Sequence, residues 1–326
     1  PLQQVEQVML EGRQRFLPVI SAEGEVVGAV TRTDLLRSLH EERFGGREGA
    51  QGAAAPARNV RGYIEERVPR EVREALKTVG EIADESGFPV FLVGGIVRDL
   101  FLRVANLDID IVVEGDGIYE SPAALPTVEL SSIKKDLYRR DFTINALAVR
   151  LNRKRFGELI DFFGGLRDIK DRVVRVLHNL SFVEDPTRVF RAIRFEQRYD
   201  FLISKHTQNL IRTAVAMRLF TRLTGERIYD ELVLMFSELD PLKVLRRMQQ
   251  FDLLKFLHPG IRFGPEQERL FTSISDALTW YRLLYLDDPV ERWFVYLSGL
   301  LDRLKDDAAQ EALERLAVPP RVRRRV

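Results

Sequence analysis

The sequence predicts an α+β protein in which a head with a small sheet precedes an all-helical remainder. Two observations support this prediction. Between residues 90 and 113 a strand, a glycine pair, a helix and a second strand follow one another, whereas from residue 182 onward apolar residues recur mostly at helical spacing. The 326 residues are enough for two or three domains. We expect five segments, which cover residues 1–43, 44–60, 61–176, 177–239 and 240–326.

The composition is that of an ordinary globular protein, with 30% charged and 45% hydrophobic residues. No run approaches the apolar length of a membrane span, so we expect no membrane association. The chain has no cysteine, which excludes disulfides and thiolate metal sites and is compatible with a cytoplasmic protein. Because the net charge is only +1, any nucleic-acid surface must be a local patch. Nothing in the sequence specifies an oligomeric state.

The first 43 residues predict a small unit in which two strands, 16–20 and 26–30, lie between two helical stretches. The stretch RQRFLPVISAEGEVVGAVTRTDLLR resembles a CBS module that lacks its opening strand, so we expect a partial module. This resemblance implies an adenosine nucleotide bound through Thr31 and Asp34. The interpretation that we favour is a folded docking unit without a ligand, in which Thr33 is only a helix cap.

A flexible linker is expected next, because residues 44–60 are rich in glycine, alanine and proline and lack an apolar period. After the linker, Pro69 is a good first residue for a helix with apolar residues at helical spacing. Gly87 is expected to end this helix.

The stretch from Phe91 to Val113, FLVGGIVRDLFLRVANLDIDIVV, carries the chemistry of the head. Its first strand ends in Gly94-Gly95, where free N–H groups at the start of a helix favour an anion such as phosphate. Because side chains alternate along a strand, we expect Asp108 and Asp110 on one face of the second strand and its apolar residues in a core. Two adjacent carboxylates repel each other unless a cation lies between them, so this face is a candidate metal site.

An acidic pair alone is weak evidence, but GGIVRD coupled to DID is specific. Together they resemble the class II tRNA nucleotidyltransferases and bacterial poly(A) polymerases, which share the nucleotidyltransferase fold of polymerase beta. The resemblance implies that Gly94, Gly95 and Arg98 contact the triphosphate of an incoming nucleotide. It also implies two Mg²⁺ ions on the catalytic residues Asp108 and Asp110, which activate the attacking 3′-hydroxyl and neutralise the departing pyrophosphate.

In that family a further strand carries a third carboxylate that completes the metal site. After Val113 this sequence instead runs through Glu114-Gly115-Asp116-Gly117 into the polar stretch IYESPAALPTVELSS, which contains no match. Two explanations stay open: a segment near Gly117–Ile118 is left out of this sequence, or the protein lacks the third ligand. The first is favoured because the flanking motifs are intact.

Residues 136–149, DLYRRDFTINALAV, combine closely spaced polar side chains with apolar ones. A guanidinium can pair bidentately with phosphate, and an aspartate or asparagine can bond a ribose hydroxyl. The alternative is a surface ion pair between Arg140 and Asp141. RRDFTINA matches the motif with which the family binds the nucleotide's sugar and triphosphate, which implies these roles for Arg140, Asp141 and Asn145. Two further strands, 156–162 and 173–176, are expected to complete the catalytic sheet.

The stretch EDPTRVFRAIRF opens the helical part, with Asp185 as the expected N-cap and Pro186 at the first helical position. Its arginines recur along one face and mostly lack acidic partners on the same helix, so the face is either solvated or an anion site. The family resemblance implies that Asp185 and Arg188 hydrogen-bond the edge of the incoming base and replace a nucleic-acid template. It also implies that Arg191 and Arg194 neutralise the triphosphate.

TGERIYDEL matches a further family motif, and we interpret Glu226 and Arg227 as structural residues that brace the neck helices. From Asp240, a helix cap, amphipathic helices continue to the end of the sequence and would begin an RNA-holding body. A further tail is expected beyond them. Trp280 and Tyr281 could stack on bases, but their helical spacing favours a core position.

The sequence therefore predicts a template-independent RNA nucleotidyltransferase that adds AMP from ATP, or CMP and AMP from CTP and ATP, to the 3′ end of tRNA. A bacterial poly(A) polymerase is the alternative within this class, because its members share these motifs. The CBS-like unit resembles the multidomain A-adding enzymes, which act beside a separate CC-adding partner. A hypothesis of another class is an adenylate-sensing regulatory protein with an inactive transferase part.

Overall fold

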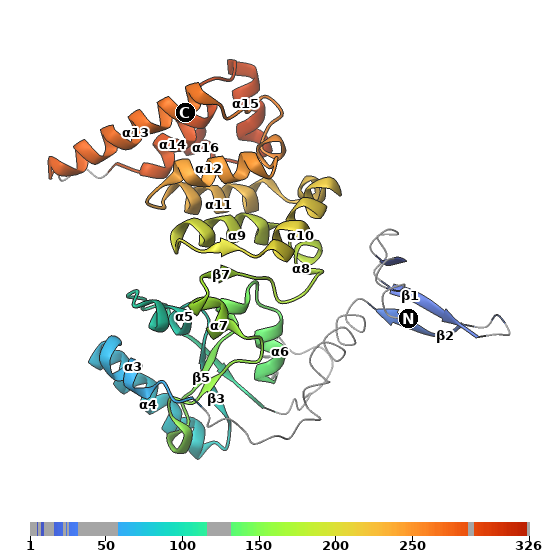
Figure 1. The fold of residues 1–326 in the computed structure, drawn as a ribbon, viewed down its shortest axis with the longest axis vertical. Helices are drawn as coiled ribbons and strands as arrows, with labels where there is room; N and C mark the ends of the chain where they lie inside the picture. The colour runs from blue at the N-terminus through green and yellow to red at the C-terminus, as the bar shows by residue number, and fades with distance from the viewer. Residues whose placement is uncertain are drawn as a thin grey trace. The chain divides into compact units, whose positions relative to one another are not determined.

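The computed structural model describes residues 5, 8, 9, 16–21, 24, 26–31, 58–115, 132–285 and 290–324. The chain forms two compact units, Pro1–Ala57 and Arg58–Val326 (Figure 1). The second unit begins inside the predicted linker. Val60 is only 2% exposed, and Asn59 forms an isolated β-bridge with Glu158.

The first unit contains the predicted hairpin. β1 (Phe16–Ile20) and β2 (Val26–Thr31) are antiparallel, and Gly24 adopts a φ of 88° in the turn between them. The N–H of Gly24 donates to the carbonyl of Ser21 at 3.0 Å, which closes the turn. Asp34, the expected adenylate contact beyond Thr31, lies outside the described residues.

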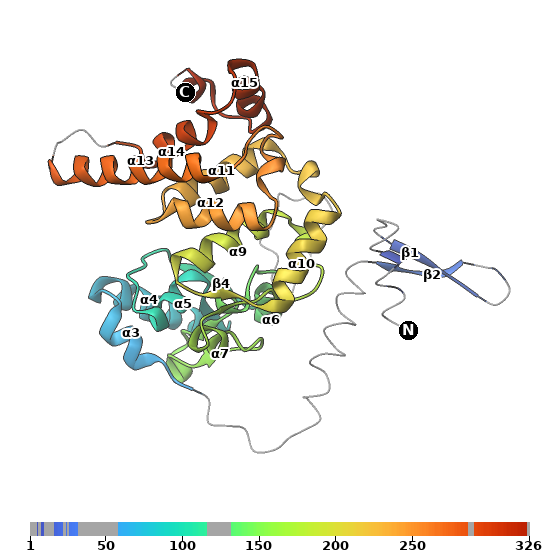
Figure 2. The same cartoon turned by 45° about the horizontal axis from the view of Figure 1, so that its top comes forward.

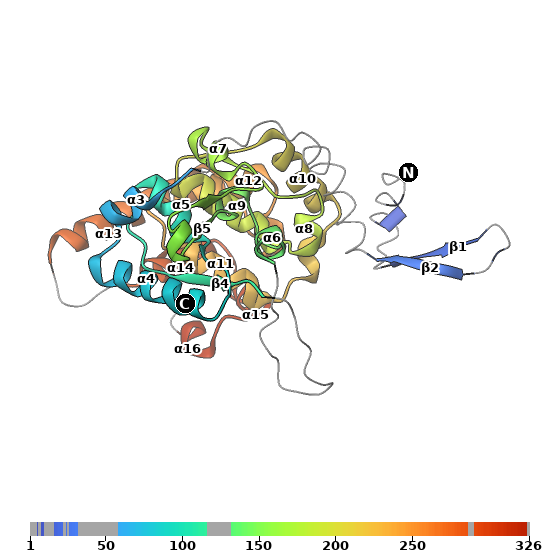
Figure 3. The ribbon, with the colours of Figure 1, turned by 90° about the horizontal axis from the view of Figure 1, so that it is seen from below.

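The head of the second unit is built on a four-stranded antiparallel sheet in the order β4-β3-β5-β6. β3 is central and fully buried, and it leads directly into α5. Figure 3 shows α3, α4 and α5 close together on the head. The strands are β3 (Val90–Val93), β4 (Asp110–Val113), β5 (Ala148–Arg150) and β6 (Leu159–Ile160); the helices are α3 (Arg61–Arg67), α4 (Arg70–Glu85), α5 (Gly95–Leu102), α6 (Ile133–Tyr138), η2 (Thr143–Asn145), η3 (Arg153–Arg155) and α7 (Gly165–Lys170).

The strand prediction around the paired aspartates is partly wrong. β4 begins at Asp110, so Asp108 precedes the strand instead of lying in it. Ile111 and Val113 are 38% and 43% exposed and do not enter a core. The reason is that β4 is the edge strand of the described sheet and has a strand on one side only.

The prediction that strand 173–176 completes the catalytic sheet is also wrong. Its ordered part, β7 (Val173–Val174), pairs in parallel with β8 (Leu202–Ile203) in a separate two-stranded sheet. The expected strand 156–162 shortens to β6, because η3 and the turn at Gly157, with a φ of 85°, occupy the preceding residues. The pairing of β7 thus depends on β8, which lies beyond the head in the sequence.

Helices make up the remainder of the second unit, as the sequence predicts. Figure 2 shows α9 between the head and the pair formed by α11 and α12. The elements are α8 (Ser181–Glu184), α9 (Thr187–Arg198), α10 (Lys205–Ala216), η4 (Leu219–Arg222), α11 (Gly225–Phe236), α12 (Pro241–Gln250), η5 (Leu254–Phe256), α13 (Pro265–Leu283), α14 (Arg292–Leu301), α15 (Asp306–Arg315) and α16 (Pro320–Arg323).

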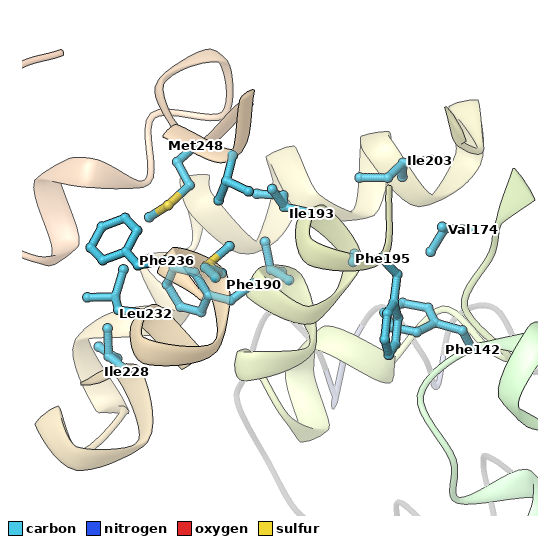
Figure 4. Close-up of a cluster of buried hydrophobic side chains, with 14 of the residues drawn as sticks. Phe142, Val174, Phe190, Ile193, Phe195, Ile203, Ile228, Leu232, Phe236 and Met248 are labelled. Atoms are coloured by element: carbon cyan, nitrogen blue, oxygen red, sulfur yellow. The ribbon is translucent and has the colours of Figure 1, made fainter. Parts of the chain in front are cut away.

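One apolar core joins the head to the helices (Figure 4). Phe195 of α9 meets Phe142 of the head edge to face, with ring centroids 5.7 Å apart. On the other side of α9, Phe190 packs in the same cluster with Phe236 and Met248. Because protein interiors are close-packed and aromatic pairs add to the energy of burial, these contacts fix α9 against the head.

Two details of the helical part bear on the sequence predictions. Asp240 caps α12 as expected, since its carboxylate accepts the N–H of Lys243 at 3.2 Å. The expected core position of Trp280 is wrong, because its side chain is 63% exposed near the end of α13. No described helix is long and apolar enough to span a membrane.

Candidate active site

The glycine pair between β3 and α5 brings a carboxylate and a guanidinium from distant motifs together. Gly94 has a φ of 79° and a ψ of −141°, a conformation that side-chain-bearing residues rarely adopt. A Cβ at this position would lie 2.8 Å from Nη1 of Arg140 and 3.0 Å from Oδ2 of Asp110. Glycine is therefore required here, and these two charged groups approach the same point beside its Cα.

The two predicted metal ligands lie together at the start of β4. Asp110 pairs with Val93 in the ladder, and Asp108 lies in the irregular segment just before it. Both side chains are exposed, and among the described residues neither carboxylate accepts a hydrogen bond or forms an ion pair. Exposed carboxylates without a neutralising partner suit a hard cation such as Mg²⁺, so the donor set fits the expected ion.

The stretch in which the third carboxylate was sought, from Gly117 and Ile118 onward, lies outside the described residues. Within the part of the chain that the structure describes, no group of three or more metal-binding side chains is found. The described site therefore contains the two carboxylates expected from the sequence, Asp108 and Asp110.

Arg140 is held in place by an aspartate that the sequence interpretation missed. Asp136 of α6 is 4% exposed and accepts from Nε and Nη2 of Arg140 at 3.2 and 2.9 Å. It also accepts two hydrogen bonds from Arg139. The available signal was the spacing of four residues between Asp136 and Arg140, which brings side chains together at a helix end. This pairing leaves Nη1 of Arg140 directed at Gly94.

Arg98, Asn145 and Asp141 form a buried hydrogen-bonded chain. Arg98 donates from Nε and Nη2 to the carboxylate of Asp99, at 2.8 and 2.9 Å, and from Nη1 to Asn145 at 2.6 Å. Asn145 in turn donates to Oδ1 of Asp141 at 2.8 Å. The polar groups of these three side chains thus bind other protein groups. Direct contact of Arg98, Asn145 and Asp141 with a nucleotide stays a prediction.

Asp185 lies in the turn between α8 and α9. The expected cap is displaced by one residue, since α9 begins at Thr187, but Oδ1 of Asp185 still accepts the N–H and hydroxyl of Thr187 at 3.1 and 2.6 Å. Arg227 of α11 donates to both oxygens of the same carboxylate. Burial raises the pKa of Asp185, but the Thr187 and Arg227 contacts outweigh it and hold this pKa below its usual value. Asp185 is therefore an ionised acceptor.

Arg188 is oriented by three protein groups. It donates from Nη1 to the hydroxyl of Ser181 and from Nη2 to the carbonyl of Arg139, both at 2.9 Å, and its Nη1 lies 3.6 Å from Glu184. The structure therefore brings Asp185 and Arg188 to the same end of α9, and it connects Arg188 to the motif that contains Arg140.

The remaining arginines of α9 have acidic partners on other elements, which the pattern within the single helix did not reveal. Arg191 donates to Asp141 at 2.8 and 2.7 Å, and Arg194 lies 3.5 Å from Glu231 and 3.9 Å from Glu238. Burial raises the pKa of Glu231 and lowers that of Arg194. For Arg191 the effect of burial is outweighed by Asp141 and Glu231, so its pKa is raised. Direct triphosphate binding by Arg191 and Arg194 stays a prediction.

Three segments of the chain match known protein families. Residues 115–175 match the family of the poly(A) polymerase head domain, and residues 200–263 match the probable RNA and SrmB-binding site of polymerase A. Residues 1–41 match the CBS domain family. The described elements of the second unit therefore fall into a head and a helical part with known relatives.

The relatives cover the whole chain. It is 41% identical to the A-adding tRNA nucleotidyltransferase of Geobacter sulfurreducens over 100% of its length, and 31% identical to that of Aquifex aeolicus over 99%. The chain spans 42% of the length of each of these relatives. The solved Thermotoga maritima CCA-adding enzyme complexed with tRNA is 40% identical, with a TM-score of 0.71 over 82% of this chain and 71% of that one. The chain belongs to the family of class II tRNA nucleotidyltransferases and bacterial poly(A) polymerases.

Proposed function

We propose that this protein is a template-independent nucleotidyltransferase that adds AMP, or CMP and AMP, to the 3′ end of tRNA. The observation that carries the proposal is the meeting at Gly94 of the Asp110 carboxylate with the Arg140 guanidinium. A carboxylate for a divalent cation beside a phosphate-binding guanidinium is the arrangement that phosphoryl transfer requires.

The nucleotide would lie between the head and the start of α9. Arg140, with Nη1 directed at Gly94, and the N–H groups of the glycine pair would bind the triphosphate. Asp185 would accept from an exocyclic amine of the base, and Arg188 would donate to a ring nitrogen or carbonyl. Thr187 and Arg227 already bind the Asp185 carboxylate, but its side chain remains 28% exposed, so it can accept a further hydrogen bond.

Asp108 and Asp110 would hold two Mg²⁺ ions, which supply charge neutralisation at the triphosphate and lower the pKa of the attacking 3′-hydroxyl. Asp110 is positioned by the antiparallel pairing of β4 with β3, in which it lies opposite Val93. The match to the Geobacter relative extends over 373 residues, compared with the 326 of this chain, so that relative contains residues without a counterpart in this sequence. We propose that a third carboxylate belongs to a segment of this kind near Gly117–Ile118.

The buried side chains behind these residues would act through them. Asp141, Asn145 and Arg98 form a hydrogen-bonded chain that ends at Arg191 of α9. We propose that this chain fixes the angle between the head, which would hold the triphosphate, and α9, which would select the base. Arg194 would stabilise α9 through Glu231.

The experiment offers the full chain two RNAs, tRNA that ends before CCA and tRNA that ends after CC, with radiolabelled CTP or ATP. Addition of AMP to the second RNA alone would identify an A-adding enzyme. Incorporation of CMP into the first RNA would exclude a pure A-adding enzyme, and CMP addition to the first RNA together with AMP addition to the second would identify a CCA-adding enzyme. Asp110→Asn should abolish addition without lowering Tm, because an exposed carboxylate without a described partner is removed. Retained addition in this variant would refute the metal role.

The same assay separates the alternatives. Long adenylate tails on RNA without a tRNA acceptor end would identify a poly(A) polymerase. Adenylate binding by the full chain without any nucleotide addition would favour the regulatory hypothesis, in which the CBS unit is the ligand-binding part.

A further inference from the structure

Asn106 links the helix after the glycine pair to the segment that carries the paired aspartates. Its Nδ2 donates to Oδ2 of Asp99, on α5, at 2.7 Å. Its Oδ1 accepts the backbone N–H of Asp108 at 2.8 Å. One half-buried amide thus uses both ends of its side chain, one toward a buried carboxylate and the other toward the backbone of a predicted metal ligand.

The two aspartates differ in what holds their backbone. Asp110 is the first residue of β4 and is in register with Val93. Asp108 lies in residues 104–109, which have no helical or strand structure. In the described residues, the acceptor of the Asp108 N–H is Asn106. The position of Asp108 relative to Asp110 therefore depends on a side chain rather than on a ladder.

Asp99, the anchor of Asn106, is itself fixed from two sides. Arg98 binds its carboxylate with two hydrogen bonds, and the two side chains are 7% and 2% exposed. The guanidinium of Arg98 lies over the ring of Tyr199, 4.7 Å from its centroid, and the Tyr199 hydroxyl donates to Asp99 at 3.4 Å. Since Tyr199 follows directly after α9, the helical part of the protein contributes to the position of Asn106.

Gly95 completes the arrangement. A Cβ on Gly95 would lie 3.3 Å from Nδ2 of Asn106 and 3.5 Å from Nη2 of Arg98. The distance to Asn106 is tight, whereas that to Arg98 is an ordinary van der Waals contact, so a larger residue at position 95 would push against the amide. The second glycine of the pair thus leaves room for Asn106, in addition to its expected role near phosphate.

We propose that Asn106 is a positioning residue that sets the Asp108 carboxylate at the spacing from Asp110 that a divalent cation needs; this inference rests on the proposed function. Asn106 does not itself touch the ion. It restricts the conformations of residues 104–109, so that the carboxylate is placed before the cation binds. Groups that orient metal ligands in this way typically change metal affinity or activity by about 10- to 100-fold when removed.

The test compares Asn106→Ala with a matched control, Asn152→Ala. Asn152 is also half-buried, accepts a backbone N–H, that of Val90, at 2.9 Å, and donates to an aspartate, Asp84, at 2.8 Å. It lies at the other end of β3, far along the strand from Asp110. Asn152 also donates to the carbonyl of Phe88 at 2.9 Å, so its variant loses one described hydrogen bond more than Asn106→Ala does, but only Asn106 adjoins the paired aspartates.

Three measurements on the full chain are needed: Mn²⁺ binding by electron paramagnetic resonance, hydrogen–deuterium exchange of residues 104–110, and nucleotide-addition kinetics. Asn106→Ala should weaken Mn²⁺ binding about 10-fold or more, speed exchange at the Asp108 amide, lower kcat and leave the KM for ATP within about twofold. Asn152→Ala should lower Tm and leave Mn²⁺ binding unchanged. Asn106→Asp, which is isosteric and replaces the donor to Asp99 by an oxygen, should weaken Mn²⁺ binding in the same way.

Unchanged Mn²⁺ binding in both Asn106 variants would overturn the inference, as would equal weakening in Asn152→Ala. The binding and exchange measurements do not depend on catalysis. If the wild-type chain adds no nucleotide to any RNA, the proposed function fails, whereas weakened Mn²⁺ binding and faster Asp108 exchange would still support the positioning role of Asn106.

Discussion

Nη2 of Arg227, on α11, lies 2.8 and 2.9 Å from the two carboxylate oxygens of Asp185, in the turn that precedes α9. The sequence interpretation treated Arg227 as a brace between neck helices. The structure shows that Arg227 binds Asp185, the residue proposed to accept a hydrogen bond from the base. The position of α11 and the geometry of base recognition are therefore connected.

The first prediction concerns this pair. Arg227→Ala removes a charged donor to Asp185. The carboxylate keeps its contacts with Thr187, but it is no longer held by Arg227 and can rotate. We expect the KM for ATP to rise about tenfold, which corresponds to the loss of roughly one charge-assisted hydrogen bond. Steady-state addition kinetics test this. Arg222→Ala, which removes an exposed arginine just before α11, should leave the KM for ATP unchanged, and an equal rise in both variants would contradict the prediction.

The second prediction concerns Gly94. Gly94→Ala places a Cβ within 3.0 Å of both Arg140 and Asp110 and forces a backbone conformation suited to glycine. We expect a loss of activity of at least about 100-fold, because the two groups must separate, together with about 1–3 kcal/mol of lost stability.

Gly87→Ala is the matched control for backbone strain. Gly87 also has a positive φ, 77°, but nothing lies within 4 Å of its added Cβ. It should cost about 1–2 kcal/mol of stability and leave kcat unchanged. Equal activity in the two variants, measured alongside urea unfolding, would refute the role of Gly94.

The third prediction concerns the buried pair between the head and α9. Asp141 is 8% exposed and binds Arg191 at 2.8 and 2.7 Å. Asp141→Asn should cost about 2 kcal/mol of unfolding free energy, because the half-buried guanidinium of Arg191 loses its main counter-charge. Adding Arg191→Leu should cost much less than the sum of the two single effects. Additivity within about 0.5 kcal/mol in a double-mutant cycle would show that the residues do not interact.

The exposed pair Arg61–Glu65, at 2.8 Å, is a control for this cycle. Both partners lie on α3 and face solvent, so their coupling should be much smaller than that of the buried pair. Urea unfolding curves for both cycles are measured under the same conditions.

The fourth prediction concerns Glu231. Burial raises its pKa, and Arg194 and Arg191 offset this only in part. The folded protein therefore binds this proton more tightly than the unfolded chain does. The contribution of Glu231 to the free energy of unfolding is largest below the ordinary pKa of 4.5 and falls as the pH rises through the raised pKa.

Glu231→Gln cannot titrate, so its Tm minus that of the wild type should increase as the pH rises from about 4 to about 7. Glu226→Gln, which alters an exposed glutamate on the same helix, controls for the loss of one charge. Thermal unfolding at several pH values provides the measurement. A difference that stays constant or decreases would be inconsistent with a raised pKa.

The sequence by itself determined the parts of the site that depend on short motifs. The glycine pair between a strand and a helix, the acidic residues at the start of β4, and the helix that starts near Asp185 all follow from local patterns. The hairpin of the first unit and the cap at Asp240 are equally local. Such features need only a few neighbouring residues, whose spacing is visible in the chain.

Only the tertiary structure decided which distant charges pair. Arg227 and Asp185, or Arg191 and Asp141, are separated by 42 and 50 positions, and no periodicity links them. The pairing of β7 was also not visible in the sequence, since β7 pairs with β8 and not with a strand of the head sheet. The physical reason is that a buried charge or a strand edge must pair with a group that lies close to it in space. The packing of α9 decides which groups are close, and that packing depends on the whole core.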